Sequence, residues 1–128
     1  MKAIYDAEID LSVLAGQGIG VLGFGAQGRA HALNLRDSGA DVRVGLRAGS
    51  PSAAACAALG LAVATPERVA EAADIVVMLV PDEVQPSLYA KVLAPRMKKG
   101  AALVFAHGYS IHYRQIMPRD DLDVVLVA

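Results

Sequence analysis

The sequence is poor in cysteine and aromatic residues, and it contains no tryptophan. Cys56 is the single cysteine, so the chain can form no internal disulfide and has no cysteine-based zinc motif. Cys56 lies in an alanine-rich segment, which favours a buried helical thiol over a reactive one. We therefore expect a reducing compartment and predict a cytoplasmic location.

Neither sign of charge dominates the sequence, and long apolar runs are absent. The 12 Lys and Arg residues nearly balance the 13 Asp and Glu residues, so the basic surface typical of a nucleic-acid or anionic-membrane binder is not expected. No apolar stretch approaches the ~20 residues needed to cross a bilayer, and the N-terminus has no secretory signal pattern. We predict a small-molecule ligand, with no nucleic-acid and no membrane partner.

What the sequence does contain is a regular alternation of strand-like and helix-like segments. Hydrophobic residues make up 55% of 128 residues, which is enough for one domain with a sheet buried on both faces. The predicted strands are 19–23, 41–46, 61–64, 74–80, 101–105 and 123–127. The predicted helices are 26–38, 51–59, 66–72 and 83–97. This order indicates an α/β fold, a Rossmann-type, doubly wound and mainly parallel sheet of about six strands.

Three apolar segments give more detailed expectations. The continuous apolar runs 75–80 and 124–127 are typical of central parallel strands. Leu11, Val13 and Leu14 precede the first strand and are expected to cover the start of the sheet. The chain ends directly after the second run, at the edge where parallel sheets bind ligands, so we interpret it as a piece of a longer protein.

A glycine motif joins the first predicted strand to the first predicted helix. Its G-x-G-x-x-G spacing consists of Gly23, Phe24, Gly25, Ala26, Gln27 and Gly28. Between a strand and a helix, this spacing is typical of dinucleotide binding, although a turn with only a packing role is the alternative. Gly23 allows a sharp turn, Gly25 leaves room for a pyrophosphate, and Gly28 allows close helix packing. The helix N-terminus offers N–H groups to the phosphates.

The end of the second predicted strand indicates which dinucleotide is bound. NAD-binding domains usually place an acidic residue there, about 20 residues after the glycines, to hold the ribose 2′-OH. Here the position is occupied by Arg47, followed by Ser50 and Ser52. A guanidinium and two hydroxyls suit a 2′-phosphate, which predicts NADPH. A solvated arginine with a serine-capped helix is the alternative.

Two further positions carry polar groups at strand ends. His107 follows Ala106 at the C-terminal end of the predicted strand 101–105, at the edge that faces the nicotinamide in this fold, so both a functional and a structural role are open. Asp82 and Glu83 are adjacent and therefore diverge at a helix start, which argues against a metal pair. Asp82 is expected to cap the helix that contains Pro86.

Taken together, the motifs resemble the N-terminal NADP-binding domain of ketol-acid reductoisomerase, also called acetohydroxy-acid isomeroreductase. The resemblance extends over essentially all of residues 1–128. Its most specific parts, beyond the glycine motif, are Leu79-Val80-Pro81-Asp82-Glu83 and Phe105-Ala106-His107-Gly108. The departures from the usual pattern are Arg29 for His, Ala53 for an aromatic residue, and Tyr109-Ser110 for Phe-Asn.

The resemblance implies a role for each matched residue. It implies that 24–27 line the pyrophosphate turn and that Arg47, Ser50 and Ser52 hold the 2′-phosphate of NADPH. It makes His107 the active-site residue of this domain. The segment expected to border the cofactor consists of Asp82, Glu83, Val84 and Gln85.

The implied reaction is an alkyl migration in a 2-acetohydroxy acid, either 2-acetolactate or 2-aceto-2-hydroxybutyrate. NADPH then reduces the product to a 2,3-dihydroxy acid on the route to valine, leucine and isoleucine. The family uses two Mg²⁺ ions, whose ligands we expect in an all-helical C-terminal domain outside residues 1–128. The resemblance also implies a homo-oligomer. The cofactor domain of another NADP-dependent reductase and a stand-alone, non-catalytic NADP-binding module are the alternatives.

Overall fold

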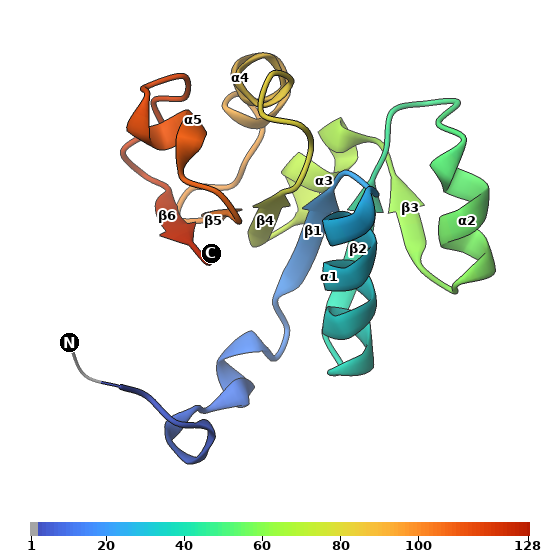
Figure 1. Ribbon diagram of the computed structural model, residues 1–128, viewed down its shortest axis with the longest axis vertical. Helices are drawn as coiled ribbons and strands as arrows, with labels where there is room; N and C mark the ends of the chain where they lie inside the picture. The colour runs from blue at the N-terminus through green and yellow to red at the C-terminus, as the bar shows by residue number, and fades with distance from the viewer. Residues whose placement is uncertain (1–2) are drawn as a thin grey trace.

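Six strands pair in the order β3-β2-β1-β4-β5-β6, and every pairing is parallel. The computed structural model describes residues 3–128. The strands are β1 (Gly18–Leu22), β2 (Asp41–Gly45), β3 (Ala62–Ala64), β4 (Ile75–Met78), β5 (Ala102–Phe105) and β6 (Asp123–Leu126). The helices are α1 (Ala26–Asp37), α2 (Ser52–Ala58), α3 (Pro66–Ala72), α4 (Gln85–Leu88) and α5 (Tyr109–His112). The predicted Rossmann-type parallel sheet is confirmed (Figure 1).

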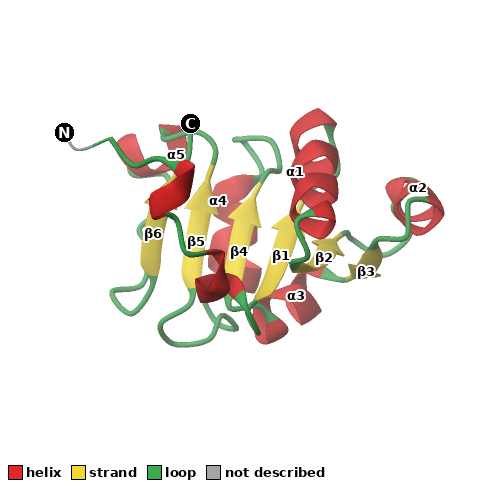
Figure 2. Ribbon diagram, turned by 90° about the horizontal axis from the view of Figure 1, so that it is seen from below, coloured by secondary structure: helices red, strands yellow, loops and turns green. Residues whose placement is uncertain are grey.

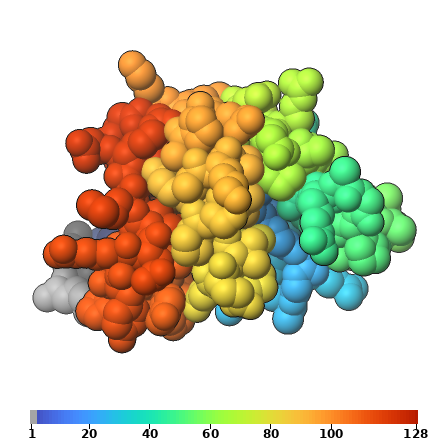
Figure 3. All heavy atoms as spheres, turned by 90° about the horizontal axis from the view of Figure 1, so that it is seen from above, coloured from blue at the N-terminus to red at the C-terminus, as the bar shows by residue number. Residues whose placement is uncertain are grey.

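Helices cover both faces of the sheet. On one face, α1 and α2 pack against the strands through Ala32 and Cys56, both of which are fully buried. On the other, α3 and the segment after α4 bury Val69, Leu93 and Phe105 in a second apolar cluster. Figure 2 views the sheet from the α1 side, with α3 and α4 behind it, and Figure 3 shows the opposite surface, where residues after 80 cover the middle of the sheet.

The strand register brings four loops to one edge of the sheet. Leu22 at the end of β1 pairs with Gly45 of β2 and with Met78 of β4, and Met78 pairs with Phe105 of β5. The glycine turn, the Arg47 loop, the loop after β4 and the segment at 107 therefore leave the sheet side by side. This carboxyl edge is where parallel α/β sheets bind ligands.

The predicted helix 83–97 is interrupted. Only Gln85–Leu88 is α-helical, and it continues as a π-helical turn at Tyr89–Leu93. The N–H of Ala94 donates to the carbonyl oxygen of Tyr89 at 2.8 Å, which is the wider i→i+5 spacing. Pro95 has no N–H to donate to the helical ladder, so the hydrogen-bond pattern is interrupted there, although Ala94 keeps helical φ and ψ of −54° and −44°.

The apolar run at the end of the chain forms an exposed edge strand, so the prediction of a central strand there was wrong. All four residues of β6 are exposed, Leu126 by 56%. β6 pairs with β5 on one side, and no further strand lies on its other side among residues 3–128. An apolar pattern indicates that a strand prefers burial, but it does not identify the segment that buries it. The same reasoning succeeds for β4, which lies between β1 and β5.

The segment before β1, residues 3–17, covers the sheet only in part. Leu11 and Val13 are each 68% exposed, so the prediction that they cover the sheet was wrong. They lie in a short 3₁₀ turn, Leu11–Leu14, which extends away from the strands (Figure 1). Leu14 does reach the sheet, where it lines a hollow of about 410 Å³ together with Ile75.

Candidate dinucleotide-binding site

The glycine turn has the geometry that the sequence predicted for Gly23 and Gly28. Gly23 has a φ of 100°, and a Cβ there would lie 2.8 Å from the carbonyl oxygen of Leu79. A Cβ at Gly28 would overlap the carbonyl oxygen of Gly23. At Gly25, by contrast, a Cβ would meet nothing within 4 Å, so the backbone there faces open space. Gly23 and Gly28 are therefore required by the fold, whereas Gly25 keeps an approach to the backbone open.

The first turn of α1 begins directly after Gly25. Gly25 is the N-cap residue and makes no side-chain capping hydrogen bond. The first intrahelical bond runs from the N–H of Arg29 to the carbonyl oxygen of Gly25 at 2.9 Å. The amides of Ala26, Gln27 and Gly28 thus belong to the turn whose N–H groups have no intrahelical acceptor. Such a helix N-terminus, with its positive dipole end, is suited to a phosphate.

Arg47, Ser50 and Ser52 border the same open space. All three line one cleft of about 560 Å³ together with Gly23 and Gly25. Phe24, Leu46 and Pro66 line the same cleft. Arg47 is exposed, and the Ser50 hydroxyl accepts a hydrogen bond from the backbone N–H of Ser52 at 3.3 Å.

No carboxylate lines the cleft among the described residues. The acid of β2, Asp41, is at the far end of that strand. A group bound beside Arg47 would therefore meet a cation and two hydroxyls without a competing negative charge. This arrangement favours a phosphate over a ribose hydroxyl.

The loop after β4 forms the remaining wall of the cleft. Val80, Pro81, Val84 and Leu88 all line it. Sequence reasoning had singled out Val84 but missed the other three. Val80 and Pro81 lie two and three residues after the end of β4, so the rule that ligands bind at strand ends could have indicated both.

Of the segment predicted to border the cofactor, Asp82, Glu83 and Gln85 do not line the cleft. Glu83 is exposed, and Asp82 is half-buried. The expectation that Asp82 caps the following helix was wrong, because Val84 is the N-cap residue and no side chain caps it. Asp82 Oδ1 instead accepts a hydrogen bond from Gln85 Nε2 at 3.2 Å, so the side chain is used within the loop.

His107 lies at the same edge but in a neighbouring hollow. The exposed imidazole lines a hollow of about 660 Å³ with Gly108, Tyr109 and Leu126. Its Nδ1 accepts a hydrogen bond from the backbone N–H of Tyr109 at 3.2 Å. The short helix α5 was not predicted, because four residues are too few to show helical periodicity.

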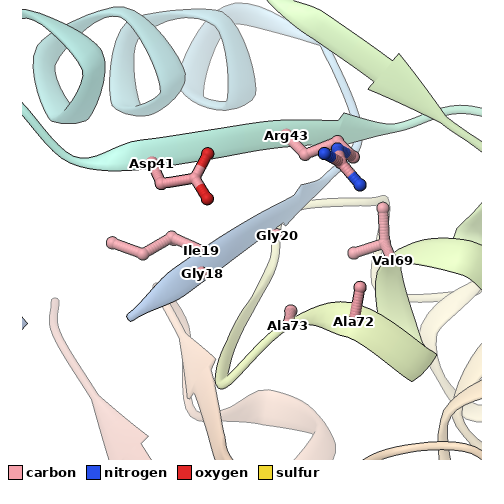
Figure 4. Close-up of a pocket in the computed structure, with 8 residues that line it drawn as sticks. All are labelled: Gly18, Ile19, Gly20, Asp41, Arg43, Val69, Ala72 and Ala73. Atoms are coloured by element: carbon pink, nitrogen blue, oxygen red, sulfur yellow. The ribbon is translucent and has the colours of Figure 1, made fainter. Parts of the chain in front are cut away.

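A hollow of about 130 Å³ lies at the amino ends of β1 and β2, where Asp41 and Arg43 extend from β2 (Figure 4). It is far smaller than the cleft and lies at the edge opposite the glycine turn.

Among residues 3–128, no group of three or more His, Cys, Asp or Glu side chains could hold a metal ion. No helix in this described part is long and apolar enough to span a membrane.

Comparison with known proteins decides the family. Residues 13–128 match the family model described as acetohydroxy acid isomeroreductase, NADPH-binding domain. The chain belongs to this family. It is 52% identical over its whole length to the ketol-acid reductoisomerase (NADP(+)) of Psychrobacter cryohalolentis, but spans only 38% of that relative.

Solved structures give the same result for the fold. The chain matches an NADH-preferring ketol-acid reductoisomerase from an uncultured archean over 100% of its length and 40% of that chain, with a TM-score of 0.92 and 40% identity. The 3-hydroxyisobutyrate dehydrogenase of Mycobacterium tuberculosis matches at a TM-score of 0.64 and 27% identity, covering 84% of this chain and 38% of that one. Because the archaeal enzyme prefers NADH, a shared fold does not by itself determine which cofactor is bound.

Proposed function

We propose that this chain is the NADPH-binding part of a ketol-acid reductoisomerase. The whole enzyme would catalyse an Mg²⁺-dependent alkyl migration in 2-acetolactate or 2-aceto-2-hydroxybutyrate, followed by reduction to a 2,3-dihydroxy acid. This reaction belongs to the synthesis of valine, leucine and isoleucine. The observation that carries the proposal is that the glycine turn and Arg47 line one and the same cleft.

The residues of the cleft fit NADPH. The open backbone at Gly25 and the uncapped N-terminus of α1 suit the pyrophosphate. Arg47 can form two charge-assisted hydrogen bonds to the 2′-phosphate, and Ser50 and Ser52 add hydroxyl donors. Val80 and Val84 offer apolar contact to the rest of the cofactor.

His107 is the residue of this chain that we assign to the reacting end of the cofactor. Bound NADPH supplies the hydride for the reduction. His107 lies after β5, next to the loop after β4 that walls the cleft, so its imidazole can reach a substrate beside the nicotinamide. With Nδ1 engaged by Tyr109, the neutral ring presents Nε2–H to that substrate as a hydrogen-bond donor.

The magnesium ions require residues outside this chain. Since the described residues contain no carboxylate cluster, the octahedral oxygen ligands that Mg²⁺ prefers would come from a further, helical domain. We therefore propose that residues 1–128 alone do not turn over substrate. We also propose that the complete protein is a cytoplasmic homo-oligomer.

The test is turnover of 2-acetolactate by the complete gene product, followed by the loss of NADPH absorbance in the presence and absence of Mg²⁺. We expect oxidation of NADPH that depends on Mg²⁺ and yields a 2,3-dihydroxy acid. Reduction of simple 2-keto acids without alkyl migration would instead identify another NADP-dependent reductase. NADPH binding by a complete product that turns over neither class would indicate a non-catalytic module.

A further inference from the structure

Gln85 is a buried polar residue that forms hydrogen bonds to two separate loops. Its side chain is 4% exposed, and its partner Ser110 is 1% exposed. Nε2 donates to the carbonyl oxygen of Val80 at 3.0 Å and to Asp82 Oδ1 at 3.2 Å. Oε1 accepts from the Ser110 hydroxyl at 2.7 Å. Both the nitrogen and the oxygen of the Gln85 amide are therefore hydrogen-bonded inside the protein.

The partners determine the orientation of the amide. The carbonyl oxygen of Val80 can only accept a hydrogen bond, so Nε2 must face it. This places Oε1 toward Ser110, whose hydroxyl donates to it. A side chain held in this way cannot also turn toward the cleft without leaving buried polar groups unpaired.

The hydrogen bond between Gln85 and Ser110 joins the two loops that the proposed reaction has to align. Val80 is part of the cleft wall, and Ser110 lies in α5, three residues after His107. Beyond the last paired residues of β4 and β5, it is the single hydrogen bond between segments 79–88 and 106–113 in the described chain.

We propose that Gln85 and Ser110 are positioning residues, which hold His107 in place relative to the cofactor cleft. Gln85 thus acts through its buried amide and not through contact of that amide with NADPH. The inference rests on the proposed function, because the distance that the pair controls is the one between His107 and the bound cofactor. Small displacements of this kind can lower rates up to ~10²-fold.

The test uses Ser110→Ala in the complete gene product. This change removes the link between the loops but leaves Gln85 bonded to Val80 and Asp82. We expect kcat for 2-acetolactate to fall about 10-fold or more, while the Kd for NADPH changes less than about two-fold. Ser110→Asn supplies an N–H donor in place of the hydroxyl and is expected to restore much of kcat. Should Ser110→Ala fail to fold, Ser110→Cys keeps the size with a weaker donor and should give an intermediate kcat.

Tyr89→Phe is the matched control. It removes the hydroxyl that accepts from the backbone N–H of Arg119 at 2.8 Å, a hydrogen bond on the same helical segment but away from the cleft. It should lower the melting temperature without lowering kcat. In a His107→Gln background, Ser110→Ala should cause no further loss, because its effect passes through His107.

The possible results distinguish a failure of the positioning role from a failure of the proposed function. An active parent protein whose kcat is unchanged by Ser110→Ala would overturn the positioning role and leave the proposed function standing. The same holds if Ser110→Ala weakens NADPH binding as much as it lowers kcat, or if its effect persists undiminished without His107. A parent protein with no turnover overturns the proposed function and this inference with it.

Discussion

The backbone N–H of Tyr109 donates a hydrogen bond to Nδ1 of His107 at 3.2 Å. Because an N–H can only donate, Nδ1 must be unprotonated, and the neutral ring carries its proton on Nε2. Nε2 is then free to donate to a ligand in the adjacent hollow. This relationship makes His107 a hydrogen-bond donor held by its own loop, and it leads to the first prediction.

Replacing His107 by Gln in the complete gene product should lower kcat by roughly 10²- to 10⁴-fold, the usual range for a lost acid–base group. NADPH affinity should stay within a few-fold, because the phosphates are held by other loops. Steady-state rates and thermal melting on one preparation measure both effects. Loss of folding stability with full activity in the remaining folded enzyme would instead assign His107 a structural role. In the unsubstituted chain, nitrogen NMR should show the Nε2–H tautomer.

An added methyl group should destabilise the fold at Gly28 but leave the free energy of unfolding almost unchanged at Gly25. Gly28→Ala would place Cβ against the carbonyl oxygen of Gly23, so we expect a loss of about 1–3 kcal/mol or more in the free energy of unfolding. Gly25→Ala meets no atom within 4 Å and has an allowed φ of −73°, so stability should change by less than about 0.5 kcal/mol.

The ranking should be reversed for NADPH affinity: provided that both variants fold, Gly25→Ala should lower the affinity more than Gly28→Ala does. We expect Gly25→Ala to weaken binding at least about 10-fold, or ~1.4 kcal/mol, because the methyl group stands where the pyrophosphate approaches. Urea denaturation and NADPH fluorescence titration measure the two quantities. Unchanged NADPH affinity in Gly25→Ala would show that the cofactor does not approach this turn.

Asp74 links stability to pH. Its Oδ1 accepts from Lys98 Nζ at 2.8 Å and its Oδ2 from the backbone N–H of Gly18 at 2.8 Å. The Lys98 hydrogen bond, followed by that of Gly18, lowers the pKa of the Asp74 carboxyl below 3.8. Since the native pKa is lowered, the stabilisation is fully present above pH 3.8 and is lost as the pH falls through the native value.

Asp74→Asn should therefore reduce the free energy of unfolding at neutral pH by up to about 1 kcal/mol, a modest effect because the pair is partly exposed. The difference from the parent should shrink at pH values below 3.8. Denaturant unfolding across this range measures it, with Asp120→Asn as an exposed control. A difference that stays constant with pH would mean that the carboxylate charge does not contribute.

Local patterns in the sequence were sufficient for the fold and for part of the site. The strand–glycine–helix pattern around Gly23 and Gly28 depends on neighbouring residues only, and the structure confirms both roles. The placement of Arg47 follows from strand order, because β2 lies beside β1 in this fold. The exposure of β6 could not be predicted, since an apolar run does not reveal what covers it.

The pairing of Gln85 with Ser110 was equally hidden in the sequence. The two residues are 25 positions apart, and no local pattern links them. Gln85 was predicted to border the cofactor through its sequence motif, whereas the structure places its amide in a buried hydrogen-bond network. Contacts between distant loops depend on packing, which single-sequence patterns do not record.

The measurement that tests the account most directly is calorimetric titration of this chain with NADPH and with NADH. A charge-assisted contact contributes ~1.5–3 kcal/mol, so Arg47 should make NADPH binding tighter by roughly 10- to 150-fold. Arg47→Ala should remove most of this difference and leave NADH affinity nearly unchanged. Equal affinity of the unsubstituted chain for the two cofactors would contradict the assignment of Arg47, Ser50 and Ser52 to the 2′-phosphate.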